Sequence, residues 1–166
     1  MPINGRDARL SEPDRLWIEG VYRDYLDDLA PLNTGIFPVL GEVGHREPDQ
    51  VAHWFADPQA HPFVIAQATE RVGFALVVRG SGQAGYRMAE FFVSRPNRGR
   101  GVGQGAARLI FDRFAGRWEI IEYLRNPAAV RFWRRVVSRY TQGKFEERVV
   151  NGEVRQVFEC ARRTGA

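Results

Sequence analysis

The sequence of 166 residues predicts an α/β fold in which helices pack on a mixed β-sheet. Two observations support this prediction. Apolar residues recur every three to five positions in some segments and every second position in others, which indicates that amphipathic helices and strands follow one another along the chain. No internal repeat, low-complexity tract or long linker interrupts the sequence, so residues 1–166 are expected to form a single domain.

The first half of the chain is predicted to form two helices and then three strands. Ser11 or Asp14 can cap the first helix, which ends before Pro31, and Pro58 stops a second, short helix over 49–56. Residues 31–48 are rich in Pro, Gly and Asn and are expected to form a loop between these helices. Alternating apolar runs then predict three strands, over residues 63–69, 71–79 and 88–93.

The second half returns to helical spacing and ends in a hairpin. Apolar residues from Val102 to Phe114 predict a helix that opens directly from a loop of arginines and glycines. A strand over 118–123 follows, and then a helix with Pro127 in its first turn, where the missing N–H costs nothing. The last two strands are predicted over 140–150 and 153–161, joined by an Asn-Gly turn.

Composition excludes several classes of protein. No apolar run approaches the length of a membrane span, and the first residues have no apolar stretch typical of a secretory signal, so a cytoplasmic protein is expected. The single cysteine, Cys160, excludes a disulfide scaffold and a cysteine-rich zinc site. His45, His53 and His61 show no metal-binding spacing, so no metal is expected.

Charge is distributed unevenly along the chain. Residues 1–60 contain 11 acidic residues and five arginines, whereas residues 61–166 contain nine acidic and 19 basic residues. A nucleic-acid-binding protein with a pI of 9.7 would not usually begin with such an acidic segment, and no nucleic-acid partner is expected.

A loop of arginines and glycines precedes the third predicted helix, in the segment Arg98-Gly-Arg-Gly101-Val-Gly103. Free N–H groups at a helix start, with the helix dipole, favour an anion, and the glycines allow it to approach the backbone closely. The segment lacks the P-loop pattern and its lysine. Gly101, Gly103 and Ala106 satisfy the dinucleotide fingerprint G-x-G-x-x-G/A, with Glu122 spaced like its ribose-binding acid, but too many residues separate the strand from the first glycine.

A third phosphate-binding pattern fits this loop better. Arg98-x-x-Gly101-x-Gly103 resembles the Q/R-x-x-G-x-G/A acetyl-CoA motif of the GNAT N-acetyltransferase superfamily. Asn126-Pro-Ala-Ala-Val-Arg-Phe-Trp133 is similar to the next motif of that family, N-x-x-A-x-x-[LF]-Y. The order of predicted elements matches over nearly the whole chain, provided that residues 7–10 form the first strand.

The resemblance implies a mixed, mostly antiparallel sheet flanked by helices, with two strands splayed apart at the cofactor site. The pantetheine arm of acetyl-CoA would lie between those strands, its pyrophosphate would bind the arginine and glycine loop, and an asparagine would meet the arm or an ordered water. The cofactor-binding residues implied in this way are Phe91, Val93, Arg98, Gly99, Arg100, Gly101, Val102, Gly103 and Asn126.

The resemblance also implies that an amine attacks the thioester directly, so a base must remove its proton. Glu90 is a candidate base, on the opposite face of its strand from Phe91 and Val93, and the Val93 N–H would stabilise the thioester oxygen. The general acid is left open because Trp133 stands where the family usually has Tyr. Tyr140, Tyr123, water, or departure of the thiolate without an acid are the alternatives.

The predicted function is an acetyl-CoA-dependent N-acetyltransferase that acts on a small-molecule or peptide amine. Acidic residues of the N-terminal segment would attract a cationic acceptor; these are Asp24, Asp27, Asp28, Glu42 and Glu47. A homodimer formed through the C-terminal strands would be usual for such folds. The alternatives are a non-catalytic CoA-binding regulatory module and, further off, a small dinucleotide- or nucleic-acid-binding protein that uses the same loop.

Overall fold

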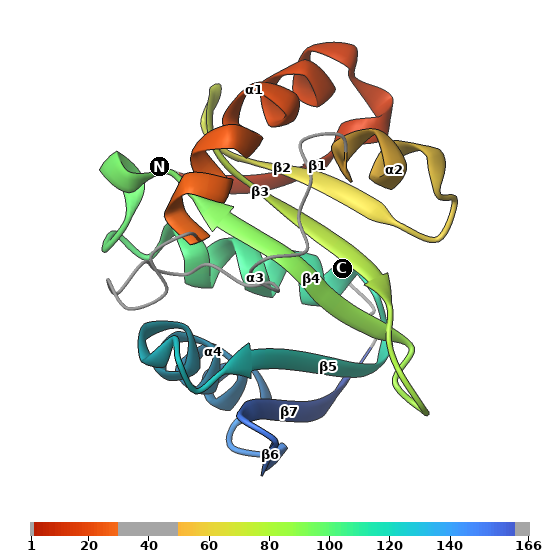
Figure 1. Cartoon of the computed structure of the whole chain (residues 1–166), viewed down its shortest axis with the longest axis vertical. Coiled ribbons are helices and arrows are strands. Elements are labelled where there is room, and N and C mark those ends of the chain that lie inside the picture. The colour runs from red at the N-terminus through yellow and green to blue at the C-terminus, as the bar shows by residue number, and fades with distance from the viewer. Residues whose placement is uncertain (1, 30–49, 162–166) are drawn as a thin grey trace.

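A seven-stranded sheet organises the protein, with helices on both faces (Figure 1). The structure, a computed structural model, describes residues 2–29 and 50–161. The strands are β1 (Ile3–Asp7), β2 (His61–Gln67), β3 (Glu70–Arg79), β4 (Tyr86–Val93), β5 (Gly116–Tyr123), β6 (Glu146–Val150) and β7 (Glu153–Cys160). The helices are α1 (Glu12–Leu29), α2 (Gln50–Ala56), α3 (Val102–Arg113) and α4 (Pro127–Thr141).

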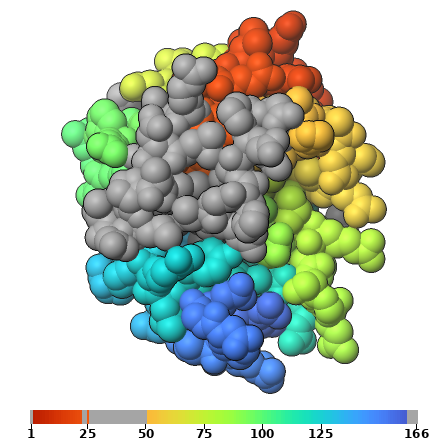
Figure 2. Space-filling view, in the orientation of Figure 1, coloured from red at the N-terminus to blue at the C-terminus, as the bar shows by residue number. Residues whose placement is uncertain are grey.

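The sheet has the order β1-β2-β3-β4-β5-β7-β6, and β4 and β5 are its parallel pair. The other neighbours run antiparallel, which confirms the predicted mixed, mostly antiparallel sheet flanked by helices. Figure 2 shows α1 and α2 at one end of the visible face, and β5 with the β6–β7 hairpin at the other.

Two hydrophobic cores cover the two faces of this sheet. The larger core packs α3 and α4 against the strands, around large aromatic side chains such as Phe111, Trp118 and Trp133. The smaller core packs α1 and α2 on the opposite face, around Tyr25, Trp54 and Phe74. Both cores therefore meet at the central strand β4, whose alternate side chains enter one or the other.

A β-bulge in β4 determines which side chains point to which core. Leu76 of β3 pairs with Glu90, whereas the next residue of β3 pairs with Met88, so Ala89 is the extra residue of the bulge. Met88 and Phe91 consequently enter the larger core, while Ala89 packs against the smaller one. The bulge shifts the alternation by one residue and turns Glu90 toward α1.

Strands β4 and β5 pair over only two residues and then diverge. Tyr86 pairs with Trp118 and Arg87 with Glu119, and among the described residues no further pair joins the two strands. In Figure 1 the two arrows separate toward their tips. Beneath the separated part, the indole ring of Trp133 in α4 packs edge-on against Phe91 of β4, with ring centroids 5.0 Å apart. This confirms the predicted splayed strands, and the separated part is called the gap below.

Two further predictions are wrong by more than the two-residue shifts found at the ends of β2, β4 and β5. Residues 7–10 were expected to form the first strand, but β1 ends at Asp7 and residues 8–10 form a 3-10 turn. The side chain of Asp7 causes this turn because its Oδ1 accepts a hydrogen bond from the N–H of Arg9 at 2.9 Å. Tyr140 was expected to begin a strand, but α4 continues through it to Thr141 because its helical side chain still packs on Phe111.

The described residues contain no helix that is both long and apolar enough to cross a membrane. Within the same ranges no group of three or more His, Cys, Asp or Glu side chains could hold a metal ion.

Candidate functional site

The free edge of β4 faces the gap with the peptide groups of Phe91 and Val93. The N–H of Ser94 donates to the carbonyl oxygen of Val72 in β3 at 2.8 Å. Because N–H and C=O groups of successive residues point to opposite edges of a strand, the peptide groups of Val93 and Phe91 point away from β3 and into the gap. Both side chains lie in the larger core, so only their main chain is offered to a ligand.

Arg98 connects this edge to the arginine and glycine loop. Its Nε donates to the carbonyl oxygen of Val93 at 2.6 Å, and its guanidinium lies over the ring of Phe92, 5.5 Å from the centroid. A side chain thus holds the loop against the end of β4, which places the start of α3 next to the gap.

The start of α3 offers main-chain donors to an anion. Gly101 caps the helix with a φ of 79°, a left-handed conformation in which glycine avoids the strain of other residues. The first helical bond runs from the Gly105 N–H to the Gly101 carbonyl at 3.0 Å, so the N–H groups of Val102, Gly103 and Gln104 precede the helical ladder. Val102 is buried and contributes only its main chain.

The predicted loop residues Gly99 and Arg100 lie beside that helix start. Gly99 also has a positive φ, of 75°, and both residues are exposed. The exposed side chain of Arg100 adds positive charge next to the helix start. The loop therefore combines oriented N–H groups with exposed positive charge, which suits a phosphate-bearing ligand.

Asn126 lies at the opposite edge of the gap, where β5 turns into α4. Its Oδ1 accepts a hydrogen bond from the Ala129 N–H at 3.2 Å and caps α4, while its own N–H donates to the Tyr123 carbonyl at 2.9 Å. Asn126 therefore caps α4, and this capping role holds it at the edge of the gap.

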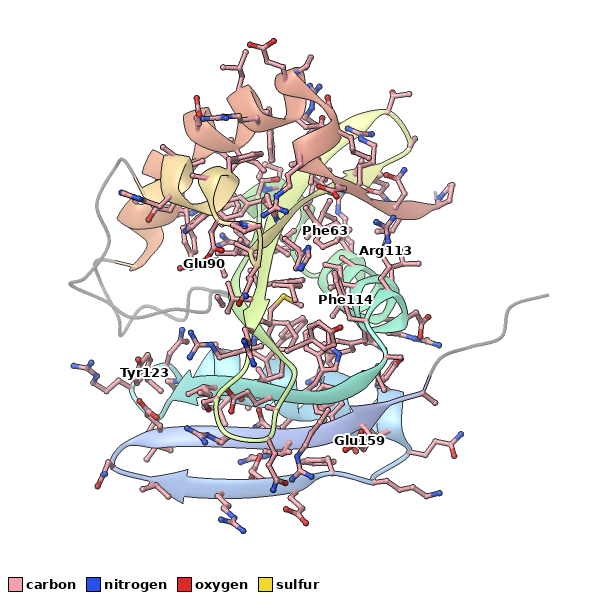
Figure 3. All side chains as sticks on the ribbon, turned by 90° about the vertical axis from the view of Figure 1, so that its right-hand side faces the viewer. Phe63, Glu90, Arg113, Phe114, Tyr123 and Glu159 are labelled. Atoms are coloured by element: carbon pink, nitrogen blue, oxygen red, sulfur yellow. The ribbon has the colours of Figure 1, made fainter. Side chains whose placement is uncertain are left out.

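Glu90, the candidate base, lies on the face of β4 opposite the side chains of Phe91 and Val93. It is buried, and it accepts a hydrogen bond from the hydroxyl of Tyr25 in α1. Tyr25 packs edge-on against Phe74 and Phe92, with centroids 5.2 and 5.7 Å apart, which holds its hydroxyl under Glu90. Figure 3 shows Glu90 on β4 on the same side of the view as Tyr123 at the end of β5.

Tyr140, the candidate acid, is not brought to the gap. It lies near the other end of α4 from Asn126, about 21 Å along the helix axis. Its hydroxyl donates to Asp112 Oδ1 of α3 at 2.7 Å. Burial and that hydrogen bond raise the pKa of Tyr140 well above its ordinary value, so the phenol holds its proton and is a poor acid.

Trp133 occupies the position beneath the gap where the sequence motif usually has Tyr. The side chain is fully buried among Phe91, Phe111 and Phe132. Its Nε1–H has no hydrogen-bond partner among the described residues. The indole therefore packs as a core residue of α4.

Sequence reasoning missed two residues that shape the site. Tyr25 lies within the first predicted helix, where its sequence pattern indicates only a buried position, and its hydroxyl contact joins residues 65 positions apart. Gly73 of β3 faces Val93, and a Cβ there would lie 2.1 Å from the carbonyl oxygen of Phe92, so only glycine lets the two strands approach. An isolated glycine within an apolar strand pattern was the available signal for Gly73.

The structure does not describe the side chains of the acidic residues that were predicted to attract the acceptor. Glu42 and Glu47 lie outside the described residues, together with His45 and the predicted loop, and α1 is described at Asp24, Asp27 and Asp28 only as backbone. Cys160 is buried, and burial raises the pKa of its thiol to about 12, so it stays protonated.

A family model described as the acetyltransferase (GNAT) family matches residues 14–137, which include the gap, the loop and most of α4. The chain belongs to the GNAT family. No curated protein matches the sequence. The GNAT assignment confirms the resemblance stated for the two sequence motifs.

Solved structures share the GNAT fold at low sequence identity. An acetyltransferase from Thermus thermophilus is 15% identical, with a TM-score of 0.67 over 96% of this chain and 97% of that one. The yncA protein of Salmonella typhimurium, a putative acetyltransferase with its cofactor acetyl-CoA, is 13% identical, with a TM-score of 0.65 over 100% and 98%. The ribosomal-protein-S18-alanine N-acetyltransferase of Escherichia coli is 11% identical, with a TM-score of 0.58 over 96% and 95%.

Proposed function

We propose that this GNAT protein is an acetyl-CoA-dependent N-acetyltransferase. One observation carries the proposal: the Arg98 side chain joins the free edge of β4 to the anion-attracting start of α3. A ligand that fills both places must have an extended arm with peptide-like groups and a phosphate end, which is the chemistry of CoA. The solved relative from Salmonella typhimurium is described with acetyl-CoA bound, which supports the same ligand here.

Each predicted cofactor residue has a distinct role in this proposal. The peptide group of Phe91 and the N–H of Val93 hydrogen-bond the acetyl-pantetheine arm as a neighbouring strand would, while the Val93 carbonyl oxygen accepts from Arg98. The N–H groups of the α3 start bind the pyrophosphate, with Arg98 fixing the loop and Arg100 adding charge. When bound, acetyl-CoA supplies an acetyl group activated as a thioester.

Glu90 is proposed as the base that takes the proton of the acceptor ammonium. It lies on the α1 face of β4, next to the edge where the Val93 N–H can donate to the thioester oxygen. The hydroxyl of Tyr25 donates a hydrogen bond to the Glu90 carboxylate and orients it. With that proton on Glu90, the neutral amine attacks the thioester carbon and the C–S bond breaks as the amide forms. The second proton that the amine nitrogen loses balances the proton that the departing CoA thiolate receives.

Tyr123 is proposed as the proton donor to that thiolate. Of the two tyrosines named from the sequence, Tyr123 ends β5 at the gap, whereas Tyr140 lies a helix length away and is bonded to Asp112. By alternation along β5, Tyr123 points to the same sheet face as Glu90, since Trp118 and Ile120 point into the larger core. The proposed base and acid therefore share one face.

The acceptor is proposed to be a small-molecule or peptide amine, drawn by the acidic N-terminal segment. A homodimer through the C-terminal strands and a cytoplasmic location also remain proposals. An alternative, a CoA-binding module without catalysis, is favoured by one observation: Trp133 lacks the hydroxyl that the family motif usually supplies.

Thermal unfolding with acetyl-CoA, CoA, NADH or an oligonucleotide separates these functions. Stabilisation by both CoA forms, with thiol release when an amine panel is added, is expected for the enzyme. Stabilisation without thiol release for any amine would indicate the regulatory module, and a response only to NADH or oligonucleotide would refute both. Gly101→Val, which forces a β-branched residue into a left-handed conformation at the helix start, should abolish the CoA shift.

A further inference from the structure

Glu122 is a buried carboxyl group that the proposed mechanism does not use. Its side chain points from β5 toward α4, since residues at every second position of a strand share one face and Trp118 and Ile120 lie in the larger core. It is only 1% exposed, and neither carboxyl oxygen has a hydrogen-bond partner among the described residues. Buried polar groups in folded proteins are nearly always hydrogen-bonded, so an unpartnered buried acid requires an explanation.

Gln156 of β7 is the polar side chain beside Glu122. It is fully buried, and its amide Nε2 donates to Glu147 Oε1 at 2.9 Å, while its Oε1 has no donor within the described residues. Within the described residues, the carboxyl oxygens of Glu122 and Oε1 of Gln156 therefore lie near one another without a well-formed hydrogen bond. A proton on Glu122 supplies the donor, for which Gln156 Oε1 is the acceptor.

The contacts continue from Gln156 to α4. Glu147 of β6 accepts two hydrogen bonds from Arg134 of α4, at 3.0 and 2.9 Å. Arg134 lowers the pKa of Glu147, which is therefore ionised at neutral pH. Glu122, Gln156, Glu147 and Arg134 form a polar line that crosses from β5 through β7 and β6 to the helix.

Burial and the neighbouring polar groups together determine the pKa of Glu122, at the inner end of the polar line. Burial is the main cause that raises the pKa of Glu122, to about 9, and the negative charge of Glu147 adds to it. The amide of Gln156 and the charge of Arg134 oppose this rise. Glu122 is consequently neutral at pH 7 while Glu147 is charged.

The polar line ends next to the gap. Glu122 lies in the part of β5 that has separated from β4, one residue before Tyr123. The Tyr123 carbonyl accepts from Asn126, and the Leu124 N–H donates to the Gly152 carbonyl at 2.9 Å. The end of β5, the start of α4 and the β6–β7 turn are therefore joined into one wall of the gap.

We propose that Glu122 is a positioning residue of the cofactor site, whose neutral carboxyl closes the polar line and holds this wall at the distance that acetyl-CoA requires. The inference rests on the proposed function because it takes acetyl-CoA as the ligand of the gap. Loss of the proton would leave two carboxylates, Glu122 and Glu147, on either side of Gln156. Their repulsion loosens the wall, and acetyl-CoA binding weakens at alkaline pH.

Calorimetric titration of acetyl-CoA from about pH 7 to about pH 10 tests this inference. The dissociation constant of the wild-type protein should rise about tenfold one unit above the Glu122 midpoint, because only the neutral fraction binds well. Glu122→Gln, which cannot ionise, should lose this pH dependence. Glu159→Gln is the matched control: it removes an exposed carboxylate of β7, 3.9 Å from Arg117, and should keep the wild-type profile.

A wild-type profile without an alkaline rise, or an equal rise in Glu122→Gln, would overturn the inference while leaving the proposed function standing. Absence of acetyl-CoA binding by every folded variant at neutral pH would overturn the proposed function and the inference with it. If Glu122→Gln does not fold, Gln156→Leu replaces it, and an unchanged midpoint there would overturn the inference. Infrared difference spectra should show a neutral carboxyl band that disappears at the same midpoint.

Discussion

The Nε of Arg98 donates to the main-chain carbonyl oxygen of Val93 at 2.6 Å, so one side chain ties the phosphate-binding loop to the free edge of β4. Arg98→Ala removes this tie as well as one charge and should raise the acetyl-CoA dissociation constant by about ten- to a hundredfold, the equivalent of a charged hydrogen bond. Arg100→Ala is the matched control because it removes the same charge from an exposed position. An equal effect of both changes in calorimetry would show that charge alone matters.

The two tyrosines named as acids differ in position and should differ in kinetics. Tyr123→Phe should lower kcat with little change in the KM for acetyl-CoA, because it removes the proposed proton donor at the gap. Tyr140→Phe should leave kcat unchanged, since its hydroxyl is bonded to Asp112 at the far end of α4. Steady-state rates at saturating acetyl-CoA provide the comparison, and equal losses in both variants would contradict the assignment.

Gly73 lets β3 and β4 approach closely. Gly73→Ala would place a Cβ 2.1 Å from the Phe92 carbonyl oxygen, so β4 must shift. The free energy of unfolding should fall by about 2 kcal/mol, a usual cost of overpacking. Gly20→Ala, on the exposed face of α1 with no atom within 4 Å, should instead gain up to about 1 kcal/mol. Denaturant titration measures both, and a neutral Gly73→Ala would disprove the close approach.

Asp14 anchors α1 to two strands. Its Oδ1 accepts from Arg6 of β1 at 2.9 Å and from Arg71 of β3 at 2.8 Å, and the hydrogen bond from Arg6, with that from Arg71, lowers the pKa of Asp14. Because the pKa is lowered, the contribution of these two ion pairs to the free energy of unfolding is fully present above the unfolded-state pKa of about 4. It is lost as pH falls through the folded-state pKa. Asp14→Asn should cost about 2 kcal/mol at neutral pH.

The cost of Asp14→Asn should shrink in acid, because the wild-type carboxyl is then protonated as well. Urea unfolding at a series of pH values provides the measurement. A difference between the two proteins that stays constant down to about pH 2 would contradict the ion-pair origin of the lowered pKa.

The pKa of Glu122 is raised, whereas that of Asp14 is lowered. The pH dependence of stability that Glu122 causes therefore has the opposite sign. Between the unfolded-state pKa near 4.5 and the folded-state pKa of about 9, the unfolded chain binds fewer protons, so wild-type stability falls as pH rises. Glu122→Gln should remove this decrease of stability with pH. At pH 7 the free energy of unfolding of the variant should exceed that of the wild-type protein by on the order of 3 kcal/mol. Parallel pH–stability curves for the two proteins would contradict a neutral, buried Glu122.

Local patterns in the sequence determined the helices, the strands and the anion-binding loop. Period and capping residues predict an element from its own side chains, and the glycines of the loop mark the left-handed cap at Gly101 without knowledge of distant residues. The motifs at Arg98 and Asn126 identified the family in the same way. Where local chemistry was overlooked, as in the Asp7 cap and the last turn of α4, the predicted boundaries moved by a few residues.

Only the tertiary structure decided how far β4 separates from β5, which hydroxyl meets Glu90, and that Glu122 is neutral. Each depends on groups far apart in sequence: Tyr25 lies 65 residues from Glu90, and the pKa of Glu122 reflects burial under α4 together with Gln156 and Glu147. The sequence does not distinguish a glutamate that is ionised from one that is neutral. Burial and neighbouring charge, which folding alone creates, give Glu122 a different protonation state from Glu147.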